Sequence, residues 1–169
     1  MPKPDLSRVA SPYHNYINQV QEDDLASAFA NGTKNFTGFI ESIPAGKQDY
    51  KYAPGKWSIK EVLQHIIDGE RVFAYRALCF ARMDSTPLPG FEENLWAENA
   101  HCENRKWNDL VEEFRTVRKA SEILFASFNE EQLEASGIAS GNPNYVLGFG
   151  YIIIGHSLHH QRIIKERYL

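Results

Sequence analysis

The residues best suited to chemistry in this sequence are two histidines near its C-terminal end, His156 and His160. Residues four positions apart lie one turn apart on the same side of a helix, and two imidazoles so placed can bind one metal ion. Apolar residues flank the pair in the same stripe: Phe149, Ile153 and Ile164. A buried imidazole without a partner costs about 1–3 kcal/mol. The pair therefore indicates either a metal site or a set of hydrogen-bonded core histidines.

A third histidine, His65, shifts the balance toward a metal site. It lies at the edge of the apolar face of another predicted helix, on the same side as Val62 and Gly69. Facing helices of a bundle are where such sites are built. Three neutral histidine ligands leave at least one coordination position open, as in catalytic rather than structural sites. We therefore expect one divalent ion bound by His65, His156 and His160.

Other polar residues are expected to surround this site without binding the ion. His159 lies about 60° from the direction of the ligand pair on a helical wheel, so it is interpreted as a rim or supporting residue. Asp68, one turn beyond His65, either accepts a hydrogen bond from an imidazole and orients it or is simply solvated. His14 and His101 fall in predicted irregular segments and are interpreted as surface residues.

The sequence offers no competing protein nucleophile. Cys79 and Cys102 form no C-x-x-C pair and are expected to be small, buried or half-buried free thiols, which favours the cytoplasm. No Ser-His-Asp or Cys-His arrangement is evident. Glu70 points away from His65 on the wheel, and no acidic residue occupies an obvious general-base position. The catalytic group is therefore expected to be a metal-bound water or thiolate.

Four stretches with helical periodicity must position the histidines, and Pro/Gly-rich segments separate them. The predicted helices cover approximately residues 22–43, 58–83, 108–128 and 144–167. The second begins with Ser58 and Glu61, an S-x-x-E capping box. No convincing strand is present. The pattern predicts an all-α four-helix bundle that forms a single domain over residues 1–169.

Two further segments lie outside the four predicted helices. Residues 1–21 form an irregular arm, held down by Tyr13, Tyr16 and Ile17. Residues 84–106, between the second and third helices, are long for a bundle loop and are expected to contain a short helix near 92–100. This loop would roof a cleft at the ends of the second and fourth helices. The loop residues of interest are Phe91, Asn94, Trp96 and Asn99; alternatively, Phe91 and Trp96 only seal the core.

Composition excludes several classes of protein. The chain has a net charge of −4, with 43% hydrophobic and 24% charged residues, as in soluble globular proteins. Lys and Arg form no dense run, which argues against nucleic-acid binding. No apolar run approaches the roughly 18 residues of a membrane span, and the first residues lack a signal-peptide pattern. A cytoplasmic protein without nucleic-acid or membrane partners is expected.

Taken together, these motifs resemble the DinB/YfiT-like family, or DinB superfamily, over nearly the whole chain. The matching segments are residues 52–58 with Glu61 and His65, then 68–71, 75–78, 88–91 and 155–160. The family pattern is a Trp-Ser helix start, one His on the second helix and H-x-x-H-H on the fourth. Its ligand positions correspond to His65, His156 and His160 in this sequence.

The resemblance implies a four-helix bundle of the DinB/YfiT-like type, often a homodimer, that binds one divalent ion such as nickel or zinc. Relatives include S-transferases and isomerases that use low-molecular-weight thiols, and proteins described as metal-dependent hydrolases. The expected function is thus metal-dependent thiol transfer or hydrolysis on a small-molecule substrate. The alternative is a non-catalytic metal-binding or stress-response protein in which the ion only stabilises the bundle.

Overall fold

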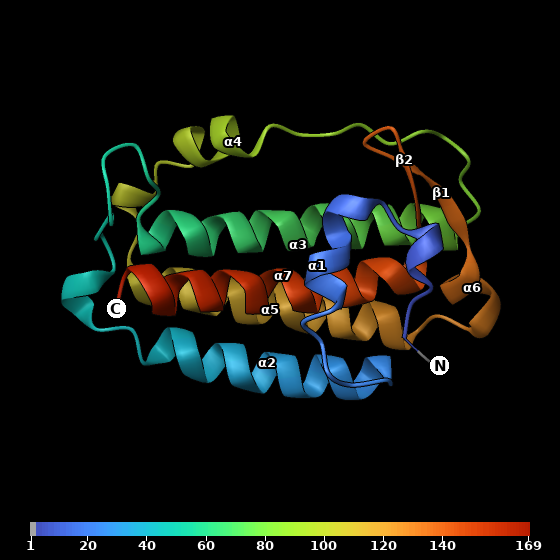
Figure 1. The fold of residues 1–169 in the computed structure, drawn as a ribbon, viewed down its shortest axis with the longest axis horizontal. Helices are drawn as coiled ribbons and strands as arrows, with labels where there is room; N and C mark the ends of the chain where they lie inside the picture. Colours follow the sequence, from blue (N-terminus) through green and yellow to red (C-terminus); the bar gives the residue numbers. More distant parts are fainter. Residues whose placement is uncertain (1–2) are drawn as a thin grey trace.

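The computed structural model describes residues 3–169 and consists mainly of four long helices that run along its longest axis (Figure 1). They are α2 (Leu25–Glu41), α3 (Ile59–Ala81), α5 (Trp107–Ala126) and α7 (Val146–Arg167). The predicted all-α bundle is confirmed, and every predicted helix end lies within three residues of the observed one. None of the helices in the described part is long and apolar enough to cross a membrane.

The direction of the helices explains the long connection between α3 and α5. Ile66 and Phe114, from the first halves of α3 and α5, share one apolar cluster, whereas Phe80 and Phe125, from their second halves, share the other. These two neighbouring helices therefore run parallel, and the chain between them must travel back along the roughly 34 Å of α3. Figure 1 shows this return path on the outside of the bundle. It contains α4 (Glu93–Asn99), close to the short helix expected there.

The start of α3 is fixed by the predicted capping box. The Ser58 hydroxyl accepts a hydrogen bond from the backbone N–H of Glu61 at 3.2 Å, and the Glu61 carboxylate accepts one from the backbone N–H of Ser58 at 2.6 Å. Both bonds satisfy N–H groups that the first turn of a helix leaves free. The cap thereby sets which residues of α3 face α7, the helix with which α3 makes its most extensive contact.

The core has a polar layer at mid-length, between the two apolar clusters. This layer holds the buried side chains of Glu70 on α3, Arg118 on α5, and His156, Ser157 and His160 on α7. Buried polar side chains are stable only where they find partners. The layer is therefore where the bundle departs from a purely apolar core, and it contains two of the three predicted ligands.

A β-hairpin precedes α7, contrary to the prediction that the chain has no strand. β1 (Ser136–Ala139) pairs antiparallel with β2 (Asn142–Tyr145). Ser140 and Gly141 form the turn with φ of 53° and 73°, the left-handed geometry of a two-residue type I′ hairpin. The strands are short and contain a proline, so they give little sequence signal. Hydrogen bonds of Leu88 with Ile138 and Ser140 join the hairpin to the long connection.

Short helical elements complete the fold. The N-terminal arm is more regular than expected, because it folds into helical turns that pack across α7 (Figure 1). These turns are η1 (Leu6–Arg8), η2 (Ser11–Tyr13) and α1 (His14–Ile17). The connections contain η3 (Ala45–Lys47), η4 (Cys102–Asn104) and α6 (Glu130–Glu134).

Candidate metal centre

The structure brings the three predicted ligands together between α3 and α7. Nε2 of His156 lies 3.0 Å from Nε2 of His65 and 3.0 Å from Nε2 of His160, and the nearest nitrogens of all three rings lie within 4.8 Å of one another. His156 and His160 are buried and His65 is half-buried. Among residues 3–169, no other three His, Cys, Asp or Glu side chains converge in this way.

The donor geometry fits one shared metal ion better than a hydrogen-bonded cluster. Two nitrogens bound to one tetrahedral zinc ion at about 2.05 Å lie roughly 3.3 Å apart, close to the observed spacing. A single imidazole nitrogen offers either one N–H or one lone pair. Nε2 of His156 therefore cannot satisfy both of its neighbours by hydrogen bonding. An ion between the rings would engage the lone pair of each.

The same burial keeps the three imidazoles in the form that a metal requires. Burial lowers the pKa of His65 to about 4. For His156 and His160, burial first and the neighbouring histidines second hold the pKa well below its ordinary value. A buried charge is costly, so each ring is neutral near pH 7 with a lone pair available.

Two close approaches of the backbone shape the surroundings of the rings. A Cβ on Gly69 of α3 would lie 3.2 Å from Cε1 of His156, so glycine at this position lets the His156 ring of α7 lie close against α3. A Cβ on Gly155 would lie 2.1 Å from the carbonyl oxygen of Tyr16, so glycine also lets α1 lie directly on α7. As a result, the Tyr16 ring packs against His156 and His159, with centroids 5.3 and 5.1 Å away.

The site opens into a cavity of about 310 Å³. It is lined by the three histidines together with Tyr13, Tyr16, Trp57, Gly69, Phe73, Phe91, Glu93 and Ser140. The predicted position of the cleft at the helix ends is wrong. The cavity lies against the middle of α3 and α7, because the returning connection and the N-terminal arm both cross the bundle there. Tyr13 and Tyr16, which the sequence indicated only as residues that hold the arm down, line this cavity.

The loop residues expected to roof the cleft divide into two groups. Phe91 lines the cavity, and its ring packs on that of Trp96 with centroids 4.6 Å apart. Trp96 is 43% exposed, so it does not seal the core. The amides of Asn94 and Asn99 instead bond locally, to the Glu92 carboxylate and the Leu95 carbonyl.

The supporting residues named from the sequence lie beside the cluster. His159 is half-buried, and its ring centroid lies 5.1 Å from that of His160. The Asp68 carboxylate accepts a hydrogen bond from Gln64 at 2.9 Å and lies 3.6 Å from the Arg71 guanidinium. These contacts do not orient an imidazole, which leaves Asp68 at the rim.

The two histidines interpreted as surface residues differ from each other. His101 is exposed, as expected. His14 is half-buried, because its Nε2 lies 2.8 Å from the carbonyl oxygen of Val9 within the arm. Neither lines the cavity.

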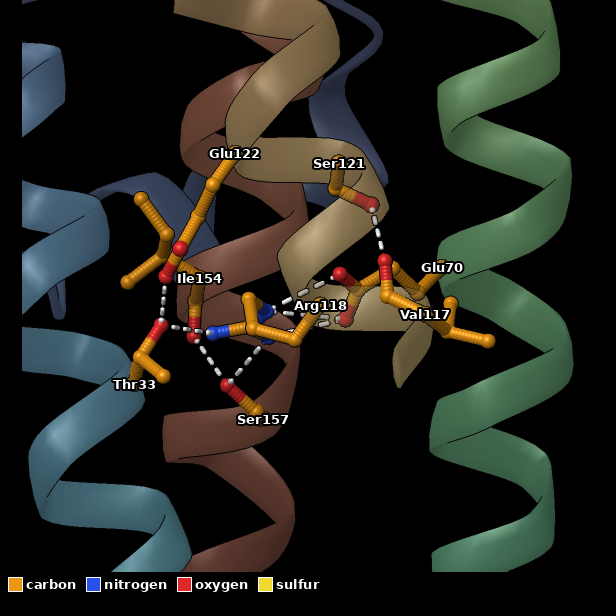
Figure 2. A network of polar contacts seen from close by, with 8 residues as sticks. All are labelled: Thr33, Glu70, Val117, Arg118, Ser121, Glu122, Ile154 and Ser157. Carbon is orange, nitrogen blue, oxygen red and sulfur yellow. Dashed lines mark hydrogen bonds and ion pairs between the residues drawn. The ribbon is translucent and has the colours of Figure 1, made fainter. Parts of the chain in front are cut away.

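Glu70, set aside as a ligand from its wheel position, belongs to a separate buried network (Figure 2). Arg118 donates to its carboxylate from Nε at 2.9 Å and from Nη2 at 2.9 Å, and the two side chains are 2% and 0% exposed. Thr33 and Ser157 lie at 3.5 Å from the same guanidinium. The network thus links all four long helices beside the histidines, and α-helical periodicity alone gives no sign of the partner of Glu70.

Glu93 is the functional candidate that the sequence did not indicate. It is the first residue of α4, and its place in the cavity depends on the path of the returning connection. Cys79 and Cys102 lie outside the cavity, and burial raises the pKa of the Cys102 thiol to about 11. The expectation that neither cysteine supplies a nucleophile at this site agrees with these positions.

Comparisons with known proteins agree with this architecture. YfiT from Bacillus subtilis, described as a probable metal-dependent hydrolase with an unusual four-helix bundle topology, superposes with a TM-score of 0.72 and 17% identity. The match covers 97% of this chain and 90% of YfiT. The mycothiol-dependent maleylpyruvate isomerase superposes with a TM-score of 0.69 and 9% identity, over 82% of this chain and 58% of the isomerase.

Sequence comparison supplies the family. No curated protein sequence matches this chain significantly. The structural matches, at such low identity, establish the fold alone. The model of the DinB superfamily, however, matches residues 28–164, which include all three histidines and all but the ends of the bundle. This chain therefore belongs to the DinB superfamily.

Proposed function

We propose that this protein is a metal-dependent enzyme that binds one divalent ion through Nε2 of His65, His156 and His160 and acts on a small molecule in the adjoining cavity. The observation that carries the proposal is the convergence of three neutral imidazoles at the wall of an open cavity. A structural site would be closed by a fourth protein ligand. No Cys, Asp or Glu of residues 3–169 joins the three histidines.

The cavity suggests how the chain's own residues contribute. A bound divalent ion supplies positive charge that polarises a substrate and favours the deprotonated form of a water or thiol beside it. The rings of Tyr16 and Trp57 pack beside those of His156 and His65, with centroids 5.3 and 4.8 Å apart, and Phe91 lines the same cavity. Apolar surfaces of this kind disfavour water near the ion, and a drier site strengthens electrostatic interactions. Burial raises the pKa of the Tyr16 hydroxyl, so this phenol stays neutral and can donate a hydrogen bond to a substrate.

Thiol transfer and hydrolysis are the two candidate reactions. Both use a nucleophile from solution, which agrees with the absence of either cysteine from the cavity wall. Thiol transfer is favoured by the resemblance to thiol-using relatives, among them the mycothiol-dependent isomerase. Hydrolysis is favoured by Glu93, a carboxylate in the cavity that could accept a proton from water, and by the description of YfiT as a probable hydrolase.

The first test is metal analysis of protein purified without chelators or an affinity tag. Zinc and nickel are the expected ions. His65→Ala, His156→Ala and His160→Ala should each lose most of the bound metal, whereas His159→Ala, the matched control, should keep it. Stoichiometric metal in the His156→Ala protein would refute the ligand assignment.

The second test separates catalysis from metal storage. The metal-loaded protein is assayed with several low-molecular-weight thiols and an electrophile such as a halogenated arene or an epoxide, and with a panel of ester and amide substrates. Turnover that is lost in His160→Ala supports an enzyme. No turnover, together with a cobalt spectrum that no thiol changes, supports the alternative of a non-catalytic metal-binding protein.

Cytoplasmic location and a homodimeric state complete the proposal. The unpaired Cys79 and Cys102 support a reducing compartment. The family resemblance supports the dimer. Sedimentation of the purified protein tests the oligomeric state directly, and a mass of 19.3 kDa would contradict the dimer.

A further inference from the structure

Arg76 is a buried cation without an acidic partner. Its side chain is 2% exposed, in the second half of α3. Within residues 3–169 its guanidinium pairs with no carboxylate, and its hydrogen-bond acceptors are the Pro89 carbonyl and the Ser140 hydroxyl, both 2.8 Å from Nη2. The N–H groups of Nε and Nη1 remain for another acceptor. Charged side chains are almost never fully buried unless they are paired.

The other fully buried arginine shows what a satisfied guanidinium looks like in this protein. Arg118 holds the Glu70 carboxylate through Nε and Nη2, and both partners are buried (Figure 2). Both arginines lie in the bundle core, but only Arg118 has its countercharge within the described chain. The countercharge of Arg76 is therefore missing from the described chain, and an anionic ligand could supply it.

The space beside Arg76 is suited to such a ligand. Arg76 lines a groove of about 360 Å³ between α3 and the returning connection, together with Val72, Tyr75, Leu88, Pro89 and Trp96. The walls are largely apolar. Two other charged residues line the groove, Asp68 and Arg71, and they pair with each other at 3.6 Å. The unpaired charge in the groove is thus that of Arg76.

The groove adjoins the histidine cavity. Phe91 lines both spaces, and Ser140, which accepts a hydrogen bond from Arg76, also lines the cavity. A ligand with an anionic group and an apolar chain could therefore place the anion at Arg76 and extend past Phe91 toward the three histidines.

We propose that Arg76 binds the carboxylate of a small-molecule ligand that lies in this groove and points its other end at the metal centre. Guanidinium and carboxylate match in geometry and charge, and such charge-assisted bonds are about twice as strong as neutral ones. As a statement about the substrate, the inference rests on the proposed metal-dependent function. The binding site itself does not require a bound metal.

The experiment is an NMR titration of the metal-free protein with hexanoate and, separately, with hexanamide, which has the same length but no charge. Arginine Nε–H resonances report the contact. Hexanoate should bind saturably, at least about ten-fold more tightly than hexanamide, and should shift the Arg76 signal. Arg76→Gln should abolish the preference, and Arg76→Lys should keep part of it. Arg82→Gln, at the end of the same helix, is the control.

Equal affinity of the wild-type protein for hexanoate and hexanamide, or no saturable binding of hexanoate, overturns the proposal without any variant. Hexanoate binding that survives Arg76→Gln, in protein shown to be folded by circular dichroism, also overturns it.

A parallel arm tests the link to the metal centre. Cobalt-loaded protein is titrated with 6-mercaptohexanoate and with 6-mercaptohexanol, and sulfur-to-cobalt absorption is recorded. A stronger cobalt band with 6-mercaptohexanoate than with 6-mercaptohexanol, which is lost in Arg76→Gln, would show that one ligand occupies both the groove and the metal centre. If hexanoate binds but neither thiol produces a cobalt band, the carboxylate site at Arg76 is supported and thiol binding at the metal is contradicted. A cobalt band of equal strength with both thiols would retain the metal site and overturn the carboxylate assignment.

Discussion

Removal of one partner of the buried Glu70–Arg118 pair is expected to lower the free energy of unfolding by an unusually large amount. Glu70→Met leaves the Arg118 guanidinium, which is 0% exposed, without its carboxylate, and Arg118→Met leaves Glu70 in the same state. Removal of one partner of a buried ion pair costs about 3–5 kcal/mol. For a chain of 169 residues this corresponds to a melting temperature lower by roughly 10 °C.

The double variant is expected to recover most of this loss. Two methionines fill similar space without a buried charge, and such replacements are often neutral or stabilising. Thr33 and Ser157 keep other partners, the Glu122 carboxylate at 2.8 Å and the Ile154 carbonyl at 2.8 Å. Urea unfolding of the wild type, both single variants and the double variant, followed by circular dichroism, gives the coupling energy.

The reasoning would be refuted by either of two results. One is single variants that lose less than about 1 kcal/mol, which would mean that solvent reaches the pair. The other is a double variant whose loss equals the sum of the single losses, which would mean that the two side chains do not stabilise one another.

Three further predictions concern the metal centre and its surroundings. Chelation should lower the melting temperature but leave the helical circular dichroism intact. The stability lost is about 4 kcal/mol if the free metal concentration was a thousand-fold above the dissociation constant. Loss of helicity on chelation would indicate a structural metal. In the metal-free protein His65 has a pKa of about 4, against 6.5 when unfolded, so the unfolded state binds the proton more tightly. Stability should therefore fall as pH drops from 6.5 toward 4, by about 3 kcal/mol from this residue, and His65→Phe should reduce this slope in urea titrations at several pH values. Gly155→Ala should destabilise the protein by about 1–3 kcal/mol, because its Cβ meets the Tyr16 carbonyl; Gly38→Ala, which meets no atom within 4 Å, is the control, and equal melting temperatures would contradict the close packing of α1 on α7.

The sequence by itself determined the parts of this protein that depend on local pattern. Apolar residues at three- and four-residue steps give the four helices, since that spacing places them on one face. Ser58 and Glu61 fix the start of α3 through bonds that span three residues. The i, i+4 spacing brings His156 and His160 to one side of α7, and the motifs around His65 were enough to suggest it as their partner.

The tertiary structure decided what depends on residues far apart in the chain. The hairpin forms because Leu88 bonds to it from another segment, and no four-residue strand would be stable alone. Glu70 and Arg76 lie about 120° apart on the helical wheel of α3, and the wheel identifies a buried partner for neither. Only the packing shows that Glu70 meets Arg118, whereas Arg76 meets no carboxylate in the described chain. Glu93 reaches the cavity because α3 and α5 run parallel and the chain must return across the site. Such placements follow from the direction of whole helices, which no local periodicity encodes.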